Sequence, residues 1–166
     1  MNIYKLLAVL IFCSTSTGIA ATRIAVLDFE LNDITSLPNT PAELQRTATM
    51  AHLLTNTLSR TGSYQTVAIS TDLQKSANGS FGYLFRYPDE AAKLGQQQHV
   101  DWMVVSQHSK PSFLFSYLWV NLVDVRTKTT VARYDIELKG SHEKVTLRAI
   151  ESLAKKIQAT IVAHEN

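Results

Sequence analysis

The stretch that decides the fold is RIAVLDF, residues 23–29. Its apolar side chains alternate between the two faces of a strand, with Ile24 and Val26 on one face and Ala25, Leu27 and Phe29 on the other. A strand that is apolar on both faces is typical of the centre of an α/β sheet, where helices cover both sides. The stretch therefore predicts a central first strand in a layered α/β domain.

The residues that follow predict a loop, a helix and a second strand. After a loop at residues 31–39, Thr40-Pro41-Ala42-Glu43 forms a capping box with proline at the first helical position. Apolar residues at helical spacing continue toward Gly62, which is placed to end the helix in a left-handed conformation. Residues 64–69 (YQTVAI) then have the composition of a strand.

The middle and late parts of the chain predict a further crossover and then antiparallel hairpins. The expected elements are a short helix opened by a capping box at Thr71–Gln74, a helix at residues 88–97 weakened by Gly95, and strands at residues 100–108, 113–125 and 130–138. The links between the last three strands are too short for parallel crossovers, so these strands must run antiparallel.

A final helix completes the predicted topology. It follows Gly140-Ser141, with Ser141 as a plausible cap, and it carries one apolar stripe made of Ile150, Leu153, Ala154, Ile157 and Ile161. The element order is β-α-β-α-β-β-β-α, which predicts a single-domain α/β fold with a mixed five-stranded sheet and packed helices. Right-handed crossovers favour the strand order 2-1-3-4-5.

Length and charge limit the class of protein. A chain of 166 residues has the size of one ordinary domain. Sixteen Lys and Arg against fourteen Asp and Glu give a net charge of +2, too little to neutralise many phosphates. The composition therefore argues against nucleic acid as a partner.

The first twenty residues predict a secretory signal peptide. Lys5 gives a positive start, residues 6–13 are apolar, and a small-residue segment ends in Gly18-Ile19-Ala20. The apolar stretch is too short to span a bilayer, so we expect no stable membrane anchor after cleavage. The predicted organisation is a signal peptide at residues 1–20 and one α/β domain at residues 21–166, located in the periplasm. Cleavage also removes Cys13, the only cysteine, and with it any disulfide or thiolate site.

Several short motifs carry a family resemblance. They are RIAVLDFEL at residues 23–31, SRTGSYQTV at 59–67, VNLVDVRT at 120–127 and the closing DIELKGSHEKVTLRAIESL at 135–153. Together they resemble a family of predicted periplasmic proteins of unknown function. More distantly, the chain resembles the amino-terminal domain of TolB and the curli-secretion and penicillin-binding-protein-activator lipoproteins. This resemblance implies a TolB-amino-terminal-domain-like fold and a non-enzymatic role in the cell envelope.

Two carboxylates are candidates for a ligand or metal site. Asp28 and Glu30 stand at the carboxyl end of the first strand, the edge where open α/β sheets usually bind ligands. The alternative is that Asp28 hydrogen-bonds the following loop and Glu30 is solvated, and no acidic cluster of fixed spacing accompanies them. His99, Asp101 and His108 do not share one face of a strand, so a metal site built from them would need distortion.

Aromatic residues are the second candidate feature. Residues 81–87 hold the candidate partner-binding side chains Phe81, Tyr83, Phe85, Arg86 and Tyr87. Phe113, Phe115, Tyr117 and Trp119 share one face of the fourth predicted strand. The four strand aromatics either pack as core under the final helix or extend a surface that docks a partner, for which aromatics and arginine are favoured anchors.

These observations predict a periplasmic, non-enzymatic accessory domain that binds another cell-envelope protein. The chain contains no nucleophile elbow, phosphate-binding loop or dinucleotide fingerprint, so we assign no catalytic residues and expect no cofactor. The alternative function is a periplasmic small-ligand or metal-binding protein that uses Asp28 and Glu30.

Overall fold

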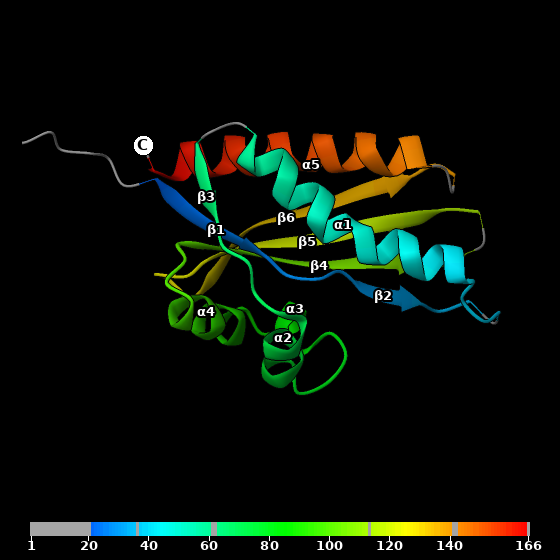
Figure 1. Ribbon diagram of the computed structural model, residues 1–166, viewed down its shortest axis with the longest axis horizontal. Coiled ribbons are helices and arrows are strands. Elements are labelled where there is room, and N and C mark those ends of the chain that lie inside the picture. The colour runs from blue at the N-terminus through cyan, green and yellow to red at the C-terminus, as the bar shows by residue number, and fades with distance from the viewer. Residues whose placement is uncertain (1–20, 36, 61–62, 113, 141–142, 166) are drawn as a thin grey trace, which may run out of the picture.

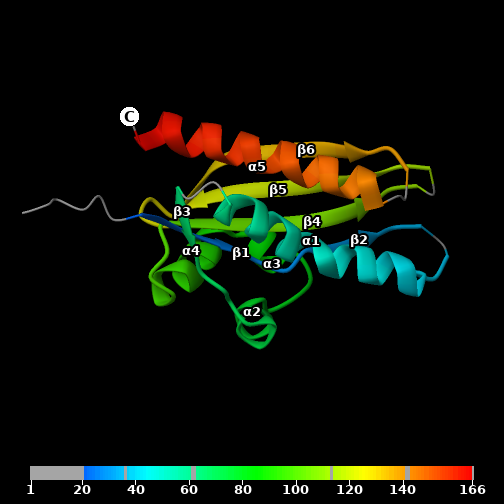
Figure 2. The same ribbon diagram turned by 45° about the horizontal axis from the view of Figure 1, so that its top comes forward.

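A twisted sheet with helices on both faces forms the molecule. The computed structural model describes residues 21–166 apart from residues 36, 61–62, 113, 141–142 and 166, so the predicted signal peptide lies outside the described residues. The strands are β1 (Thr22–Val26), β2 (Glu30–Asp33), β3 (Tyr64–Thr66), β4 (Trp102–Lys110), β5 (Ser116–Asp124) and β6 (Thr129–Leu138). The helices are α1 (Pro41–Ser59), α2 (Thr71–Ala77), α3 (Tyr83–Arg86), α4 (Pro88–Gln97) and α5 (Glu143–Glu165). Helices α1 and α5 cover one face, and the shorter α2, α3 and α4 lie on the other (Figure 1, Figure 2).

The sheet has the predicted strand order. The observed order is β3-β1-β4-β5-β6, with β1 parallel to both β3 and β4 and with β4, β5 and β6 antiparallel. This matches the predicted order 2-1-3-4-5. The number of strands was wrong by one, because the segment expected to be a loop after residue 30 forms β2, which pairs with β4 beyond the end of β1.

A bulge separates β1 from β2. Ile24 pairs with Trp102 and Glu30 pairs with Gln107, so six steps along the first strand match five along β4. The extra residue reverses the alternation beyond it. Phe29 consequently packs in the apolar cluster that contains Ile24, and not with Ala25 and Leu27 as the uninterrupted strand predicted.

Two apolar clusters lie on the two faces of the sheet. The larger includes Leu54 of α1 and Ile157 of α5, and the smaller includes Leu94 of α4. Gly95 explains how closely α4 approaches the sheet: a Cβ atom there would lie 2.7 Å from Val125 Cγ2 and 2.8 Å from Met103 Cγ. The residue that weakens the helix by propensity thus permits its packing.

The observed cap of α1 is the predicted residue, and the observed cap of α2 lies one residue before the predicted one. The Thr40 hydroxyl accepts a hydrogen bond from the amide of Glu43 at 3.2 Å, as the capping box predicted. At α2 the cap is Ser70, whose hydroxyl accepts from the amide of Leu73, so the prediction that placed the cap at Thr71 was wrong by one residue. The predicted helix end at Gly62 and cap at Ser141 lie outside the described residues.

Candidate functional site

Asp28 contacts α2 through its backbone and its side chain. The side-chain amide of Gln74 bonds both backbone groups of Asp28, accepting from its N–H at 2.8 Å and donating to its C=O at 3.0 Å. Asp28 Oδ2 also accepts a hydrogen bond from the Thr71 hydroxyl at 2.6 Å. The bulge therefore serves as the attachment point of α2.

Glu30 attaches the segment before α3 to the sheet. Its carboxylate accepts hydrogen bonds from the Gly82 amide at 3.0 Å, from Asn78 Nδ2 at 2.5 Å and from Gln107 Nε2 at 3.3 Å. All three donors are neutral, so Glu30 is stabilised by hydrogen bonds without an ion pair among them. Asn78 in turn accepts from the amide of Leu84 at 3.1 Å, which fixes the start of α3.

The segment at residues 81–87 forms a short helix, so its aromatic residues do not alternate as they would in a strand. Phe81 is 53% exposed and Tyr87 is 49% exposed, whereas Tyr83 and Phe85 are half-buried against the smaller apolar cluster. The rings of Tyr83 and Tyr87, one helical turn apart, have their centroids 4.9 Å from each other. The predicted partner-binding residues thus divide into exposed and packed members.

Arg86 is exposed, but its guanidinium bonds its own segment. Nε donates to the carbonyl oxygen of Gly82 at 3.3 Å, and Nη2 donates to that of Phe81 at 3.0 Å. Gly82 has φ of +69°, a left-handed conformation that glycine adopts without strain. Arg86 and Gly82 therefore fix the backbone conformation that holds the exposed side chain of Phe81.

The aromatic residues of β5 lie on the face away from α5. Tyr117 and Trp119 are half-buried, while Leu118 and Val120 between and beyond them point into the larger cluster under α5. Of the two alternatives for the strand aromatics, packing under the final helix is therefore wrong for Tyr117 and Trp119. Phe115 precedes β5; it is 39% exposed and lines a hollow together with Glu43 and Arg46 of α1. Phe113, the fourth member, lies outside the described residues.

The two aromatic segments meet on the same part of the sheet. Gln107 of β4 pairs directly with Trp119 of β5, and Gln107 also lines a hollow of about 240 Å³ together with Phe81 and Phe85. Asn121 Nδ2, two residues from Trp119 on the same face, donates to the carbonyl of Phe85 at 2.8 Å. We call this region the aromatic surface, consisting of Phe81, Phe85, Tyr117 and Trp119. One alternative in the sequence analysis joined both segments in a docking surface, but the pattern did not indicate that Gln107 and Asn121 connect them.

A buried histidine forms a second polar cluster, which the sequence did not single out. His108 of β4 is fully buried, with Nδ1 at 2.7 Å from the Thr47 hydroxyl and Nε2 at 3.0 Å from the Ser116 hydroxyl. Thr47 also donates to the carbonyl of Glu43 at 3.0 Å, an arrangement in which its oxygen accepts from Nδ1–H of a neutral ring.

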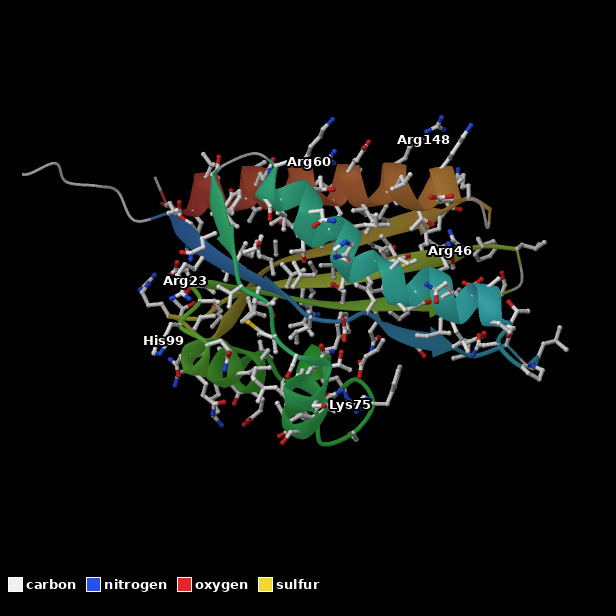
Figure 3. The ribbon with its side chains drawn as sticks, in the orientation of Figure 1. Arg23, Arg46, Arg60, Lys75, His99 and Arg148 are labelled. Atoms are coloured by element: carbon white, nitrogen blue, oxygen red, sulfur yellow. The ribbon has the colours of Figure 1, made fainter. Side chains whose placement is uncertain are left out.

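Burial, together with the positive charges of Arg46 and Lys110, lowers the pKa of His108 to about 4. The carboxylate of Asp33 favours the protonated ring, but burial outweighs it. Glu43 Oε1 lies 3.4 Å from Nε2. Arg46, labelled on α1 in Figure 3, donates from Nε to the Thr146 hydroxyl at 2.8 Å and so joins α1 to α5 beside this cluster.

A hollow of about 870 Å³ lies at the end of the sheet opposite to His108. Arg23 and His99, both labelled in Figure 3, line it. The carboxylate of Asp101 there accepts a hydrogen bond from the backbone amide of Arg23 at 2.7 Å. Within the part of the chain that the structure describes, no group of three or more His, Cys, Asp or Glu side chains could hold a metal ion. None of the described helices has the length and apolar character needed to cross a membrane.

Several solved structures have the same fold. TolB from Acinetobacter baumannii matches with a TM-score of 0.57 at 14% identity, over 86% of this chain and 29% of the TolB chain. The LpoB C-terminal domain from Salmonella enterica matches with a TM-score of 0.50 at 15% identity, over 75% of this chain and 87% of that domain. Lipoprotein GNA1162 from Neisseria meningitidis matches with a TM-score of 0.50 at 14% identity, over 82% of this chain and 96% of the lipoprotein. At these identities the likeness concerns the fold, and it confirms the expected TolB-like α/β architecture.

The family assignment rests on a match at the level of sequence. No curated protein matches the chain significantly. The profile of the family described as "Protein of unknown function (DUF2380)" matches residues 22–157, which cover the sheet and most of α5. The chain belongs to this family of proteins of unknown function.

Proposed function

We propose that this chain is an exported, non-enzymatic protein of the periplasm that binds another protein of the cell envelope through the aromatic surface. The observation that carries the proposal is that Phe81 and Trp119 both lie next to Gln107 of β4: Phe81 lines the same hollow as Gln107, and Trp119 pairs with Gln107 across the ladder. Exposed aromatic side chains that gather in one place are typical of recognition sites, because they bury much apolar area with few rotatable bonds.

The shape of the aromatic surface fits a protein partner better than a small molecule. Its hollow of about 240 Å³ falls below the volumes typical of small-molecule pockets, which are about 300–1,000 Å³. Phe81 protrudes beside the hollow with half of its surface in solvent. Such a surface suits a protein partner that has a depression to receive the ring of Phe81 and an apolar side chain to fill the hollow beside it.

The state of the acid–base groups supports a non-enzymatic role. Ser116 and His108 lie within hydrogen-bond distance, as a nucleophile and its general base would. However, the His108 ring is fully buried, and a pKa of about 4 makes it a weak base near neutral pH. This pair therefore suits a structural role.

An envelope location is part of the proposal. It is supported by the signal-peptide pattern of residues 1–20, by the resemblance to penicillin-binding-protein-activator lipoproteins, and by a fold neighbour that is itself a lipoprotein. The alternative of a ligand or metal site at Asp28 and Glu30 draws no support from their contacts, because both carboxylates accept hydrogen bonds from the protein.

Site-specific photocrosslinking in the native cells tests the proposal. A benzophenone amino acid is placed at Phe81 or Trp119, with Leu44 on α1 as the control because Leu44 is also about half exposed, at 52%. We expect the same covalent adduct from Phe81 and Trp119, recovered in the periplasmic fraction, and no such adduct from Leu44.

Two results would contradict the proposal. One is the absence of any adduct at both aromatic positions in a protein whose circular dichroism matches the unmodified chain. The other is an identical set of adducts from Leu44, which would indicate nonspecific collision. Recovery of the protein in the cytoplasmic fraction alone would overturn the envelope location.

A further inference from the structure

Strand β6 is an unpaired edge of the sheet. It stands last in the strand order and pairs with β5 alone. Alternate residues of an edge strand turn their backbone N–H and C=O groups outward, where they can pair with another chain. No backbone hydrogen bond outside the sheet ladder joins β6 to another described residue. This edge is therefore open along its length.

Arg133 and Asp135, on the exposed face of β6, have no ion partner among the described residues. Arg133 pairs across the ladder with Asn121, and Asp135 pairs with Trp119. Both charged side chains are exposed, and neither forms a salt bridge or side-chain hydrogen bond with another described residue. Edge strands commonly carry charge to discourage association, but here the two charges are opposite and two residues apart.

We propose that β6 binds β6 of a second copy of this chain, antiparallel and centred on Tyr134. In that register Arg133 of each copy lies directly opposite Asp135 of the other, so two opposite-charge pairs form about the symmetry axis. On the other face, Ala132 lies opposite Ile136. The strand is thus complementary to itself in charge and in side-chain size.

The neighbouring registers place like charges together. Centring the pair on Arg133 opposes two arginines, and centring it on Asp135 opposes two aspartates. In either of these registers the two opposite-charge pairs are lost and a like-charge pair forms, and like charges directly opposite each other destabilise a ladder. A bulge also limits the match: Leu122 pairs with Ala132 and Val123 with Thr130, so Val131 is left unpaired. Regular pairing of the two copies therefore centres on residues 132–136.

The face above β6 also fits a second copy. The axis of such a pair stands perpendicular to the sheet, so α5 of both copies lies on the same side. On that side, a shallow hollow of about 380 Å³ is lined by Val131 and by the small α5 residues Ala159, Thr160 and Ala163. Tyr134 marks the centre, with its hydroxyl donating to Thr160 Oγ1 at 2.7 Å. Small side chains at this place allow two helices to approach closely.

Charge exchange across the proposed axis tests the inference. The mass of the purified protein is measured by sedimentation velocity over a range of concentrations, for the wild type and for Arg133→Asp, Asp135→Arg and the double exchange. Each single variant opposes like charges, and we expect its dimer dissociation constant to rise at least about tenfold. The double exchange restores opposite pairs and returns the constant to within about threefold of the wild type.

The outcomes separate this inference from general edge association. A wild-type protein that stays monomeric up to about 1 mM would overturn it. Dimers that are equally stable in all four proteins would show that another surface, or another register, joins the copies. Circular dichroism and thermal unfolding check that each variant is folded. Because the substituted residues are exposed, we expect the fold of the monomer to be unchanged. The result does not depend on whether the aromatic surface binds a partner.

Discussion

The buried His108 makes stability depend on pH between about 6.5 and 4. The ring is neutral in the folded chain because its pKa is lowered from 6.5 to about 4, chiefly by burial. The unfolded chain binds a proton at the ordinary pKa, so as the pH falls through this range the unfolded state gains protons that the folded state does not. Folding is therefore stabilised above about pH 6.5, and this contribution is lost as the pH falls toward 4.

The magnitude follows from the difference between the two pKa values. A lowering from 6.5 to about 4 corresponds to about 3 kcal/mol of unfolding free energy, at about 1.4 kcal/mol per pH unit. That is a large part of the 5–15 kcal/mol that holds a typical domain folded. Asp33 contributes in a different pH range. Burial raises the pKa of its carboxyl group, but hydrogen bonds from Thr35 and Lys110 outweigh burial and lower the pKa below the ordinary 3.8. Its contribution to stability is therefore lost only in stronger acid.

Urea unfolding at a series of pH values measures the effect. Titration of His108 should lower the free energy of unfolding of the wild type by about 2.4 kcal/mol between about pH 7 and about pH 4.5. His108→Gln removes the titrating group and should flatten that dependence, although loss of the ring packing lowers its stability at neutral pH. His52→Gln is the matched control, because His52 is an exposed histidine on α1. The reasoning is refuted if His108→Gln shows the same decline with pH as the wild type.

Three further substitutions test the packing around the candidate site. Gly95→Ala should destabilise the fold by about 1–3 kcal/mol, because its Cβ would lie 2.7 Å from a neighbouring side chain, whereas Gly79→Ala meets nothing within 4 Å and serves as its control in thermal unfolding. Gln74→Ala leaves both backbone groups of the bulge without their bonds and should cost about 1–3 kcal/mol in urea unfolding; an unchanged midpoint would contradict this. Phe81→Ser should change stability by less than about 0.5 kcal/mol, and Phe85→Ser by about 2 kcal/mol or more, since only the second ring packs on the smaller cluster; equal losses by calorimetry would refute that division.

The fold was predictable where local patterns decide it. Short links force antiparallel hairpins, and α4 was expected at residues 88–97, which are its observed bounds. The bulge was not predictable, because it depends on Gln74, a residue 46 positions from Asp28 in the chain. Local alternation in RIAVLDF gives no sign of a contact made at that distance. The extra strand β2 and the reversed face of Phe29 both follow from this one contact.

The candidate site was predictable in composition but not in arrangement. Alternation correctly put Tyr117 and Trp119 on one face of a strand, whereas Phe115 lies before β5 begins. It did not choose which face, because Leu118 and Val120 make the opposite face just as apolar. That choice depends on where the helices dock. The adjacency of Phe81 depends on the hydrogen bonds of Glu30, which a sequence pattern does not contain.

These hydrogen bonds of Glu30 also determine how the native molecule opens. The segment from Asn78 to Leu84 is joined to the sheet mainly through one carboxylate and its neutral donors, and it packs on the smaller of two separate clusters. Transient loss of these bonds frees the segment while the larger cluster stays closed, and such local opening costs less free energy than complete unfolding. The aromatic surface is therefore built from two unlike halves. We therefore expect Trp119, on a strand inside the sheet, to be held more rigidly than Phe81, whose segment is attached mainly by the hydrogen bonds of Glu30.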